Sequence, residues 1–418
     1  MKNRRITLLA SSVVFMEWLE YALYMYLGVA ISTYFFPHED NGIPLLLTYS
    51  IFAISYIGRP LGGFIFGVYA DKRGRRKPLI FSSLLAGVAT AAIGVIPSYA
   101  AVGMLAPALL LICRLAQSFA VSGEFNNSSI YLIEHASNNR ILAGAWIGTA
   151  ASAGMFFGGV VAYLVSLSSH PNSWQIAFVV IGLLSIALAC FRKQLAESPE
   201  FLKSKSERDR AGSKIDIFRT LAKHKTGIFK IAVIGAFLCV YVYVCNVYFV
   251  SYMITKLGYS ASSASFNMTM VQGAVTILIP IFALLAEKTG YVRMLKICIP
   301  AIAVMSVLQF YGASIQSHEM IIAGFIVYAL ANSGVSACIF KYMHDVLPTD
   351  VRCTGGSLTY SVSAAVFGGT APLLAASLVD SGHVLMPAVY VVAFSVLTYV
   401  SVVFRKPVHQ KENSPVKA

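Results

Sequence analysis

Charged residues are scarce in this chain: Asp, Glu, Lys and Arg make up only 12% of its 418 residues. A soluble domain carries about 25% charged residues, so too few remain here to cover a surface that faces water. Hydrophobic residues make up 57% of the chain. Its apolar stretches repeatedly reach the ~20 residues that a spanning helix needs, and the alternating pattern of a membrane β-barrel is absent. The sequence therefore predicts an all-α polytopic membrane protein, because backbone inside lipid must be hydrogen-bonded internally.

The sequence also lacks residues arranged for catalysis or for metal binding. The seven cysteines lie in or beside apolar stretches and show neither a disulfide framework nor zinc spacing. We find no phosphate-binding loop, catalytic triad or metal constellation, and the loops are too short for a catalytic domain. We therefore expect no enzyme activity, no cofactor and no metal site.

The apolar stretches divide into twelve expected transmembrane helices, six on each side of one long polar segment. Their approximate positions are 6–33, 44–70, 78–97, 101–127, 141–167, 173–191, 227–255, 262–286, 293–313, 318–343, 353–379 and 385–404. The expected domains are an N-terminal six-helix bundle at 1–191, a cytoplasmic linker at 192–226, a C-terminal six-helix bundle at 227–404 and a cytoplasmic tail at 405–418.

Basic residues predict the orientation of these spans. With both termini inside, 29 of the 32 Lys and Arg fall in inner segments or at the inner ends of the approximate spans, whereas Lys256 lies outside and Arg59 and Arg114 lie deeper within spans. The positive-inside rule requires such a bias. The net charge of +14 is then confined to one membrane face, so we expect the lipid bilayer as a partner and no nucleic acid.

A short motif occurs once in each half of the chain. Residues 67–77 read GVYADKRGRRK, and residues 287–293, in the corresponding place after the eighth span, read EKTGYVR. In both, an acid is followed three residues later by glycine and then by a base, as repeated transporter halves would show. The first copy resembles the signature G-x-x-x-D-R-x-G-R-R of the major facilitator superfamily, and LAESPEF at 195–201 resembles that superfamily's E-S-P motif. The resemblance implies the major facilitator fold.

Further segments resemble the metabolite:proton symporter family within that superfamily, which includes proline/betaine, citrate, α-ketoglutarate and shikimate carriers. They are EWLEYALY at 17–24, GRPLGG at 58–63, RLAQSFAVSGE at 114–124, and VRCTG at 351–355 running on to FGGTAP at 367–372. The resemblance implies proton-coupled transport across a bacterial cytoplasmic (inner) membrane by a protein that we expect to be a monomer. It does not identify the solute.

Charged side chains inside the expected spans need a reason, because each costs roughly 2.5–3.5 kcal/mol near the bilayer centre. Glu17, Glu20 and Tyr24 lie on one face of the first span, at spacings of three and four residues. Arg114 lies near the middle of the fourth span, and Gln117 continues its stripe toward the inner side. Helices one and four therefore each offer a charged face, one acidic and one starting with a base.

Proton coupling is expected at carboxylates. Histidine has the side-chain pKa nearest neutrality, but all eight histidines fall outside the expected spans. Desolvation raises the pKa of a buried carboxyl and a nearby arginine lowers it, so a Glu that alternates between these surroundings can load and release a proton. Glu17 and Glu20 are the first candidates for this role, and Glu124, closer to the cytoplasm, is the next. Each could instead pair with a base only to hold helices together.

Arg114 is expected to tune the proton carrier or to hold an anionic solute, because an arginine fork matches a carboxylate. The full set of expected substrate-binding residues is Tyr24, Arg114, Gln117, Asn246 and Tyr360. The two tyrosines could instead serve packing.

Four further residues are expected to act as gates between helices. Arg59 belongs to a Gly-Arg-Pro segment that looks like a packing and gating element. Asp71, with Arg75 and Arg76, is expected to form a clasp at the inner surface rather than a ligand site.

The function predicted is proton-coupled import of a small polar metabolite. Its expected classes are an organic acid, an amino acid or betaine-like osmolyte, and a citrate-like iron chelate. The alternative is a proton-driven exporter or antiporter of the same fold. Such exporters resemble one another in G-x-x-x-G-P-x-x-G-G on helix five, whereas residues 148–159 read GTAASAGMFFGG and lack the proline. A nonconducting sensor built on the fold also stays open.

Overall fold

The computed structural model describes residues 2–37, 43–168, 170, 172–210 and 216–404, and every regular element among them is a helix. Eleven helices of this part of the chain are long and apolar enough to cross a membrane. Large apolar side chains such as Leu8, Ile277 and Ile297 are exposed on the outside of the bundle. Such an exterior suits lipid, and helices satisfy their own backbone hydrogen bonds there. The all-α membrane prediction is confirmed.

The first half comprises α1 (Lys2–Tyr26), α2 (Gly28–Phe35), α3 (Ile43–Ser55), α4 (Gly58–Arg73), α5 (Arg76–Val95), α6 (Tyr99–Val102), α7 (Leu105–His135), α8 (Arg140–Leu167), α9 (Ser173–Phe191) and the 3-10 helix η1 (Arg192–Gln194). The connecting segment carries α10 (Pro199–Arg210) and α11 (Ile217–Lys223). Residues 211–215 of the expected linker and the expected tail at 405–418 lie outside the described residues.

The second half comprises α12 (Lys225–Val242), the π-helical segment η2 (Tyr243–Tyr248), α13 (Phe249–Thr255), α14 (Ala261–Thr289), α15 (Tyr291–Ser314), α16 (His318–Val346), α17 (Arg352–Ser363), the π-helical segment η3 (Ala364–Gly368), α18 (Gly369–Asp380) and α19 (Met386–Val403).

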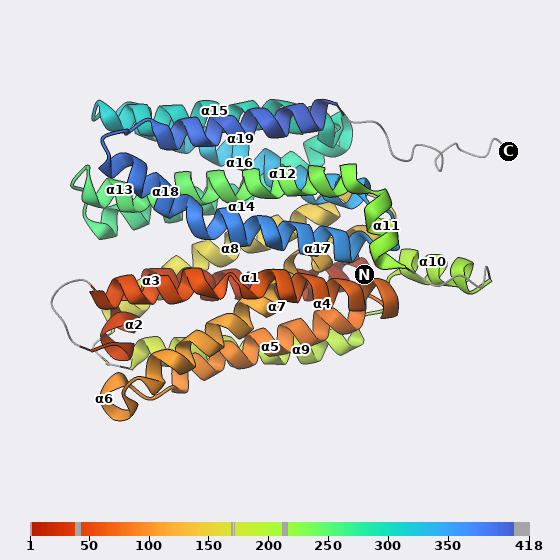
Figure 1. The fold of residues 1–418 in the computed structure, drawn as a ribbon, viewed down its shortest axis with the longest axis horizontal. Coiled ribbons are helices and arrows are strands. Elements are labelled where there is room, and N and C mark those ends of the chain that lie inside the picture. The colour runs from red at the N-terminus through yellow and green to blue at the C-terminus, as the bar shows by residue number, and fades with distance from the viewer. Residues whose placement is uncertain (1, 38–42, 169, 171, 211–215, 405–418) are drawn as a thin grey trace.

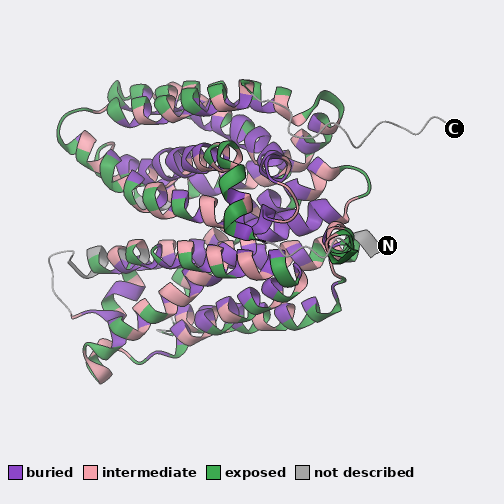
Figure 2. Cartoon of the chain, turned by 45° about the vertical axis from the view of Figure 1, so that its right-hand side comes forward, coloured by how far each residue is buried: buried purple, intermediate pink, exposed green. Residues whose placement is uncertain are grey.

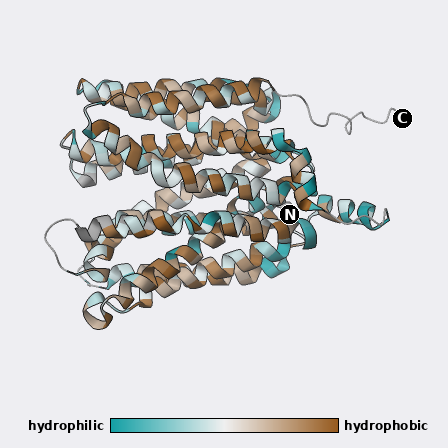
Figure 3. Ribbon diagram, viewed as in Figure 1, coloured by the Kyte–Doolittle hydropathy of each residue, from teal (hydrophilic) through white to brown (hydrophobic). Residues whose placement is uncertain are grey.

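The two halves lie side by side, red to yellow for the first and green to blue for the second (Figure 1). They meet where α4 packs against α17 and α8 packs against α14. Buried residues gather in the interior of the halves and between them (Figure 2). Hydrophilic residues gather around the ends of α4, α10 and α11, at the end of the bundle where α1 begins (Figure 3). We call this end the inner face, because the basic residues predict that it is cytoplasmic.

The second expected span is not one helix but two, α3 and α4, which are separated at Tyr56 and Ile57. Pro60 lies in the first turn of α4 and has no N–H to bond to the carbonyl of Tyr56, so Arg59 bonds to that carbonyl instead, at 3.0 Å. The break explains why eleven long helices are found where twelve spans are expected. It also places Arg59 at a helix start inside the bundle.

Two further irregularities meet this break. The hydroxyls of Tyr56 and Tyr243, the latter at the start of η2, contact each other across the two halves. At Gly368, the last residue of η3, an added Cβ would lie 3.1 Å from ring atoms of both tyrosines. The three interruptions therefore converge on one point between the halves. Segments of π-helix frequently occur at functional sites.

Candidate transport site and inner gate

The polar residues expected on the first and fourth spans meet in a cavity inside the first half, which we call the N-half cavity. Its volume is about 30 Å³, whereas one water molecule needs ~10–15 Å³. Its lining includes Glu17, Glu20, Arg114 and Gln117, together with Arg59 at the start of α4. Three helices thus bring these five side chains together.

Arg114 is paired with Glu20 inside the first half. Its Nη1 donates to Glu20 Oε1 at 2.6 Å and to Gln117 Oε1 at 2.9 Å. Its guanidinium carbon lies 4.1 Å from the ring centre of Tyr24. Gln117 in turn donates from Nε2 to the hydroxyl of Thr90 at 2.8 Å. The acidic face of α1 and the basic face of α7 therefore meet in one buried set of hydrogen bonds.

Glu17 has a different environment. Its side chain is buried, and neither carboxylate oxygen has a hydrogen-bond partner among the described residues. The charges that act on it are those of Glu124, Arg192, Arg59 and Glu20. A buried carboxylate without a donor is costly. In this conformation no described group therefore holds Glu17 as a fixed charge through a hydrogen bond.

Glu124 forms a buried ion pair with Arg192, at 2.5 Å between Oε1 and Nη1. It also accepts hydrogen bonds from the hydroxyls of Ser82 at 2.9 Å and Ser128 at 2.6 Å. Arg192 donates in addition to the backbone carbonyls of Leu9, Ala10 and Leu79. The pair therefore ties α1, α5, α7 and the end of α9 together at the inner side of the first half.

A larger cavity of about 100 Å³ lies between the halves, and we call it the central cavity. Trp18, Arg59 and Phe125 line it from the first half. From the second half it is lined by hydroxyl, amide and aromatic groups that include Tyr241, Tyr243, Gln272, Tyr328, Asn332, Phe340 and Tyr360. Trp18 and Arg59 line both cavities, so they stand between them. Among the described lining residues of the central cavity, Arg59 is the one charged side chain.

Aromatic rings connect the two halves at this cavity. Phe125 lies 5.8 Å from Trp18, 5.2 Å from Phe340 and 5.8 Å from Tyr360, measured between ring centres. We call these four rings the aromatic wall. Of the expected second-half ligands, Tyr360 belongs to it. Asn246 lies behind the cavity lining and donates to the hydroxyl of Tyr328 at 3.2 Å.

Asp71 fastens α4 to the second half. Its carboxylate accepts hydrogen bonds from the backbone N–H groups of Cys353 at 3.2 Å and Thr354 at 2.7 Å, and from the hydroxyl of Thr354 at 2.8 Å. These N–H groups belong to the first turn of α17, where helix donors lack intrahelical partners and the helix dipole favours an anion. The expected clasp role of Asp71 fits this geometry.

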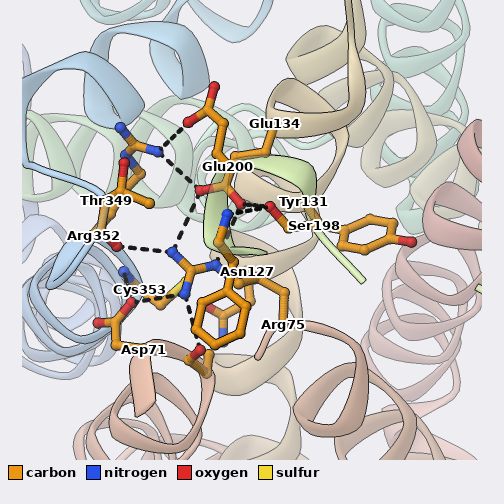
Figure 4. A network of polar contacts seen from close by, with 12 residues as sticks. Asp71, Arg75, Asn127, Tyr131, Glu134, Ser198, Glu200, Thr349, Arg352 and Cys353 are labelled. Atoms are coloured by element: carbon orange, nitrogen blue, oxygen red, sulfur yellow. Dashed lines mark hydrogen bonds and ion pairs between the residues drawn. The ribbon is translucent and has the colours of Figure 1, made fainter. Parts of the chain in front are cut away.

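Arg75 is fully buried beside Asp71, 3.4 Å from its carboxylate, and donates to Glu134 Oε2 at 3.3 Å and to the carbonyl of Thr349 at 2.8 Å (Figure 4). Thr349 belongs to the second half, so Arg75 also bridges the halves. Arg76 does not take part in this bridge and bonds to the carbonyl of Lys193 instead.

Glu200 of α10 extends the network. It accepts a hydrogen bond from Arg352 at 2.9 Å, and Arg140 pairs with its other oxygen. Burial raises the pKa of Glu200, but the surrounding cations, Arg352 foremost, lower it by more, so its pKa lies below the ordinary value. Arg352 also donates to Glu134 at 2.9 Å. We call Asp71, Arg75, Glu134, Glu200 and Arg352 the inner gate.

The second copy of the repeated motif mirrors the first. Glu287, at the end of α14, accepts hydrogen bonds from the backbone N–H groups of Ile141 at 2.6 Å and Leu142 at 3.1 Å, in the first turn of α8. Each half therefore caps a helix of the other half with an acid. The glycines of the motif, Gly74 and Gly290, have φ angles of 109° and 91° and end α4 and α14.

Sequence reasoning assigned no role to several residues of these sites, among them Arg192, Glu134, Glu200, Arg352 and Trp18. Arg192 was counted among the inner loop bases, although it directly follows an apolar helix. Glu134 is an acid in the last turn of α7, and that position was its available signal. Trp18, Glu200 and Arg352 stand within the quoted motifs, which did not give them individual roles.

Comparison with known proteins places the fold in a family. The family model described as Major Facilitator Superfamily matches residues 13–367 and 231–418. A proline/betaine transporter of Salmonella typhimurium is 28% identical over 100% of this chain and 85% of its own length. A putative proline/betaine transporter of Staphylococcus aureus is 29% identical over 93% of this chain and 85% of its own length.

Solved structures show the same fold. A double tryptophan mutant of XylE superimposes with a TM-score of 0.78 and 16% identity, covering 96% of this chain and 94% of that one. The major facilitator proton:xylose symporter XylE bound to 6-bromo-6-deoxy-D-glucose gives a TM-score of 0.75 and 17% identity, with coverage of 96% and 94%.

Proposed function

Because the chain belongs to the Major Facilitator Superfamily and is a multi-pass membrane transporter, we propose that it imports a small carboxylate-bearing solute together with protons. The two halves alternate access to the central cavity. The protein works as a monomer in a bacterial cytoplasmic membrane, with both termini inside. The names of the relatives support a zwitterion of the proline or betaine kind over the other carboxylate classes.

The observation that carries this proposal is the environment of Glu17. A symporter needs a group that binds a proton inside the membrane and can give it up again. Glu17 is a buried acid without a hydrogen-bond donor among the described residues, and it lines the N-half cavity. Glu20 is held by Arg114 at 2.6 Å, so it is the second candidate for proton exchange. Glu124, paired with Arg192, is the third.

We expect uptake by purified protein in liposomes to follow an imposed pH gradient. The panel is L-proline, glycine betaine, succinate and citrate, with the outside acidic. One or more of these solutes should accumulate, and a protonophore should abolish the accumulation. Glu17→Gln should retain solute exchange at equal concentrations but lose accumulation, because the amide resembles the protonated acid and cannot titrate.

The same assay separates import from the alternative. If an acidic outside drives preloaded solute out of the liposomes rather than in, the protein is an antiporter. If Glu17→Gln and Glu20→Gln both still concentrate solute, the proton site lies elsewhere and Glu124 is examined next.

A further inference from the structure

Arg59 is the cation that faces the solute pathway. It lines both cavities, and it makes no ion pair with any described acid at 4 Å or less. Its guanidinium lies 3.9 Å from the ring centre of Tyr56, and its buried Nε has no acceptor in the described structure. Trp18, which lines both cavities as well, has a buried Nε1 that also lacks an acceptor. Two N–H donors thus remain available at the junction of the cavities.

Arg114 differs from Arg59 in its position and in having an ion pair. It lines the N-half cavity but not the central cavity. Its Nη1 already donates to Glu20 and Gln117. A solute in the central cavity that bound Nη1 of Arg114 would compete with Glu20 for a buried ion pair, and breaking such a pair is strongly unfavourable.

Arg59 and Glu17 line the same cavity, the N-half cavity. Two cations act on this carboxyl, Arg192 from η1 and Arg59 from α4, and two acids oppose them, Glu124 from α7 and Glu20 from α1. Arg192 is already paired with Glu124 at 2.5 Å, and Arg114 pairs with Glu20. Arg59 therefore remains as the cation that can balance a charge on Glu17.

We propose that Arg59 couples the binding of the solute to the binding of a proton. Its guanidinium and the indole N–H of Trp18 bind the carboxylate of the solute in the central cavity. A carboxylate bound there neutralises the charge of Arg59 and repels a negative charge on Glu17. One proton from the outer solution therefore binds to the Glu17 carboxyl with each solute. When the solute leaves to the inside, the charge of Arg59 again balances a negative charge on Glu17, and Glu17 releases its proton. This coupling rests on the proposed import function.

The same cavity limits the solute to one carboxylate. Arg59 is the single charged group among its described lining residues, and the four rings of the aromatic wall line the same cavity. A second carboxylate would lie against rings without a counter-charge. An ammonium or methylated ammonium would instead contact the faces of Trp18 and Tyr360 favourably. The site therefore fits a zwitterion of one carboxylate and one cationic nitrogen, and it disfavours dicarboxylates and tricarboxylates.

The carboxylate contact is tested by comparing glycine betaine with its amide, which has the same shape without the carboxylate. Binding to the full chain in lipid nanodiscs should favour glycine betaine over the amide by about 10- to 100-fold, the worth of a charge-assisted hydrogen bond. Arg59→Gln should bring this ratio close to one, and Arg59→Lys should keep part of it. Arg114→Lys should leave the ratio unchanged. A purely structural role for Arg59 would weaken both ligands equally and would overturn the proposal, as would a ratio lost in Arg114→Lys but kept in Arg59→Gln.

The coupling is tested by proton uptake on binding, measured by calorimetry in buffers of different ionisation enthalpy. Wild-type protein should take up about one proton per glycine betaine near neutral pH, and Glu17→Gln should bind glycine betaine while taking up none. Unchanged proton uptake in Glu17→Gln would contradict the proposal that Arg59 couples solute binding to protonation of Glu17.

If no monocarboxylate or zwitterion is accumulated by wild-type protein under a pH gradient, the proposed function itself fails. If glycine betaine is accumulated but the ratio test fails, only the role of Arg59 is lost.

Discussion

The Glu124–Arg192 pair shows how single residues are held inside the first half. Each ion is fully buried, but the two differ in the hydrogen bonds that remain when the other ion is removed. Glu124→Gln leaves Arg192 bonded to the carbonyls of Leu9, Ala10 and Leu79. Arg192→Met leaves the buried Glu124 carboxylate without a cation, with hydrogen bonds from serine hydroxyls such as those of Ser82 and Ser128. Removing one partner of a buried pair costs about 3–5 kcal/mol. We therefore expect Arg192→Met to lower the thermal unfolding temperature in detergent far more than Glu124→Gln does.

A transport measurement on the same variant separates structure from coupling. Glu124→Gln should still accumulate solute under a pH gradient if Glu17 carries the proton. Equal destabilisation by both substitutions would contradict the view that Arg192 holds the local structure.

Residue types and helical spacing predicted which polar side chains share a face, but not which of them pair. Glu20 and Arg114 were predicted on helices one and four, and they do meet at 2.6 Å. Because Arg114 is paired in this way, Arg59 is the cation at the central cavity. This arrangement depends on how closely α1, α4 and α7 approach one another. Helix approach depends on packing in three dimensions, which spacing along one chain does not contain.

At the scale of elements, hydropathy located the long helices because lipid demands apolar runs, but it did not resolve their interruptions. The break before Gly58 has a local cause in Pro60, so it was accessible from the sequence. The π-helical segment at 243–248 contains neither proline nor glycine. Its irregularity therefore depends on tertiary contacts, among them that between Tyr243 and Tyr56.

Two glycines let α4 approach α17 closely. A Cβ at Gly63 would lie 2.8 Å from the carbonyl oxygen of Ser357, and one at Gly67 would lie 2.7 Å from the Cα of Thr354. Both obstacles are backbone atoms, which cannot rotate away. Gly67→Val should therefore prevent full closure of the inner face and favour the conformation that is open to the inside.

Cys353 reports on this change, because it is fully buried next to Asp71 in the closed inner gate. In protein whose other six cysteines are replaced by alanine, Gly67→Val should speed maleimide labelling of Cys353. A tenfold increase corresponds to a shift of ~1.4 kcal/mol in the gate equilibrium. Gly369→Val is the matched control, since a Cβ at Gly369 meets no atom within 4 Å. Equal labelling rates in the two variants would show that close packing of α4 does not control closure.

At the scale of the whole molecule, the two halves are joined by two equivalent helix caps. Asp71 caps α17 from the first half, and Glu287 caps α8 from the second. The short repeat in the sequence predicted that the halves correspond, but not that each acid reaches across to the opposite half. Both caps exist only while the inner face is closed, so both acids bias the molecule toward that state.

The two caps should differ in strength. Asp71 is fully buried, accepts three hydrogen bonds and lies 3.4 Å from Arg75. Glu287 is partly exposed and accepts two. An acid at a helix N-terminus contributes about 0.3–2 kcal/mol, with the larger values at buried sites. We therefore expect Asp71→Asn to increase the inward-open population more than Glu287→Gln, and the double variant to show roughly the sum of the two free-energy changes.

Distances between spin labels at the exposed positions Lys77 and Lys288, one on each half, measure this population by electron paramagnetic resonance. Solute affinity at equilibrium should change little, because neither acid lines the N-half cavity or the central cavity. Transport should slow, since the inner face closes less readily after solute release. A large loss of affinity in Asp71→Asn with an unchanged distance distribution would contradict this account, because it would place Asp71 in the binding site rather than at the gate.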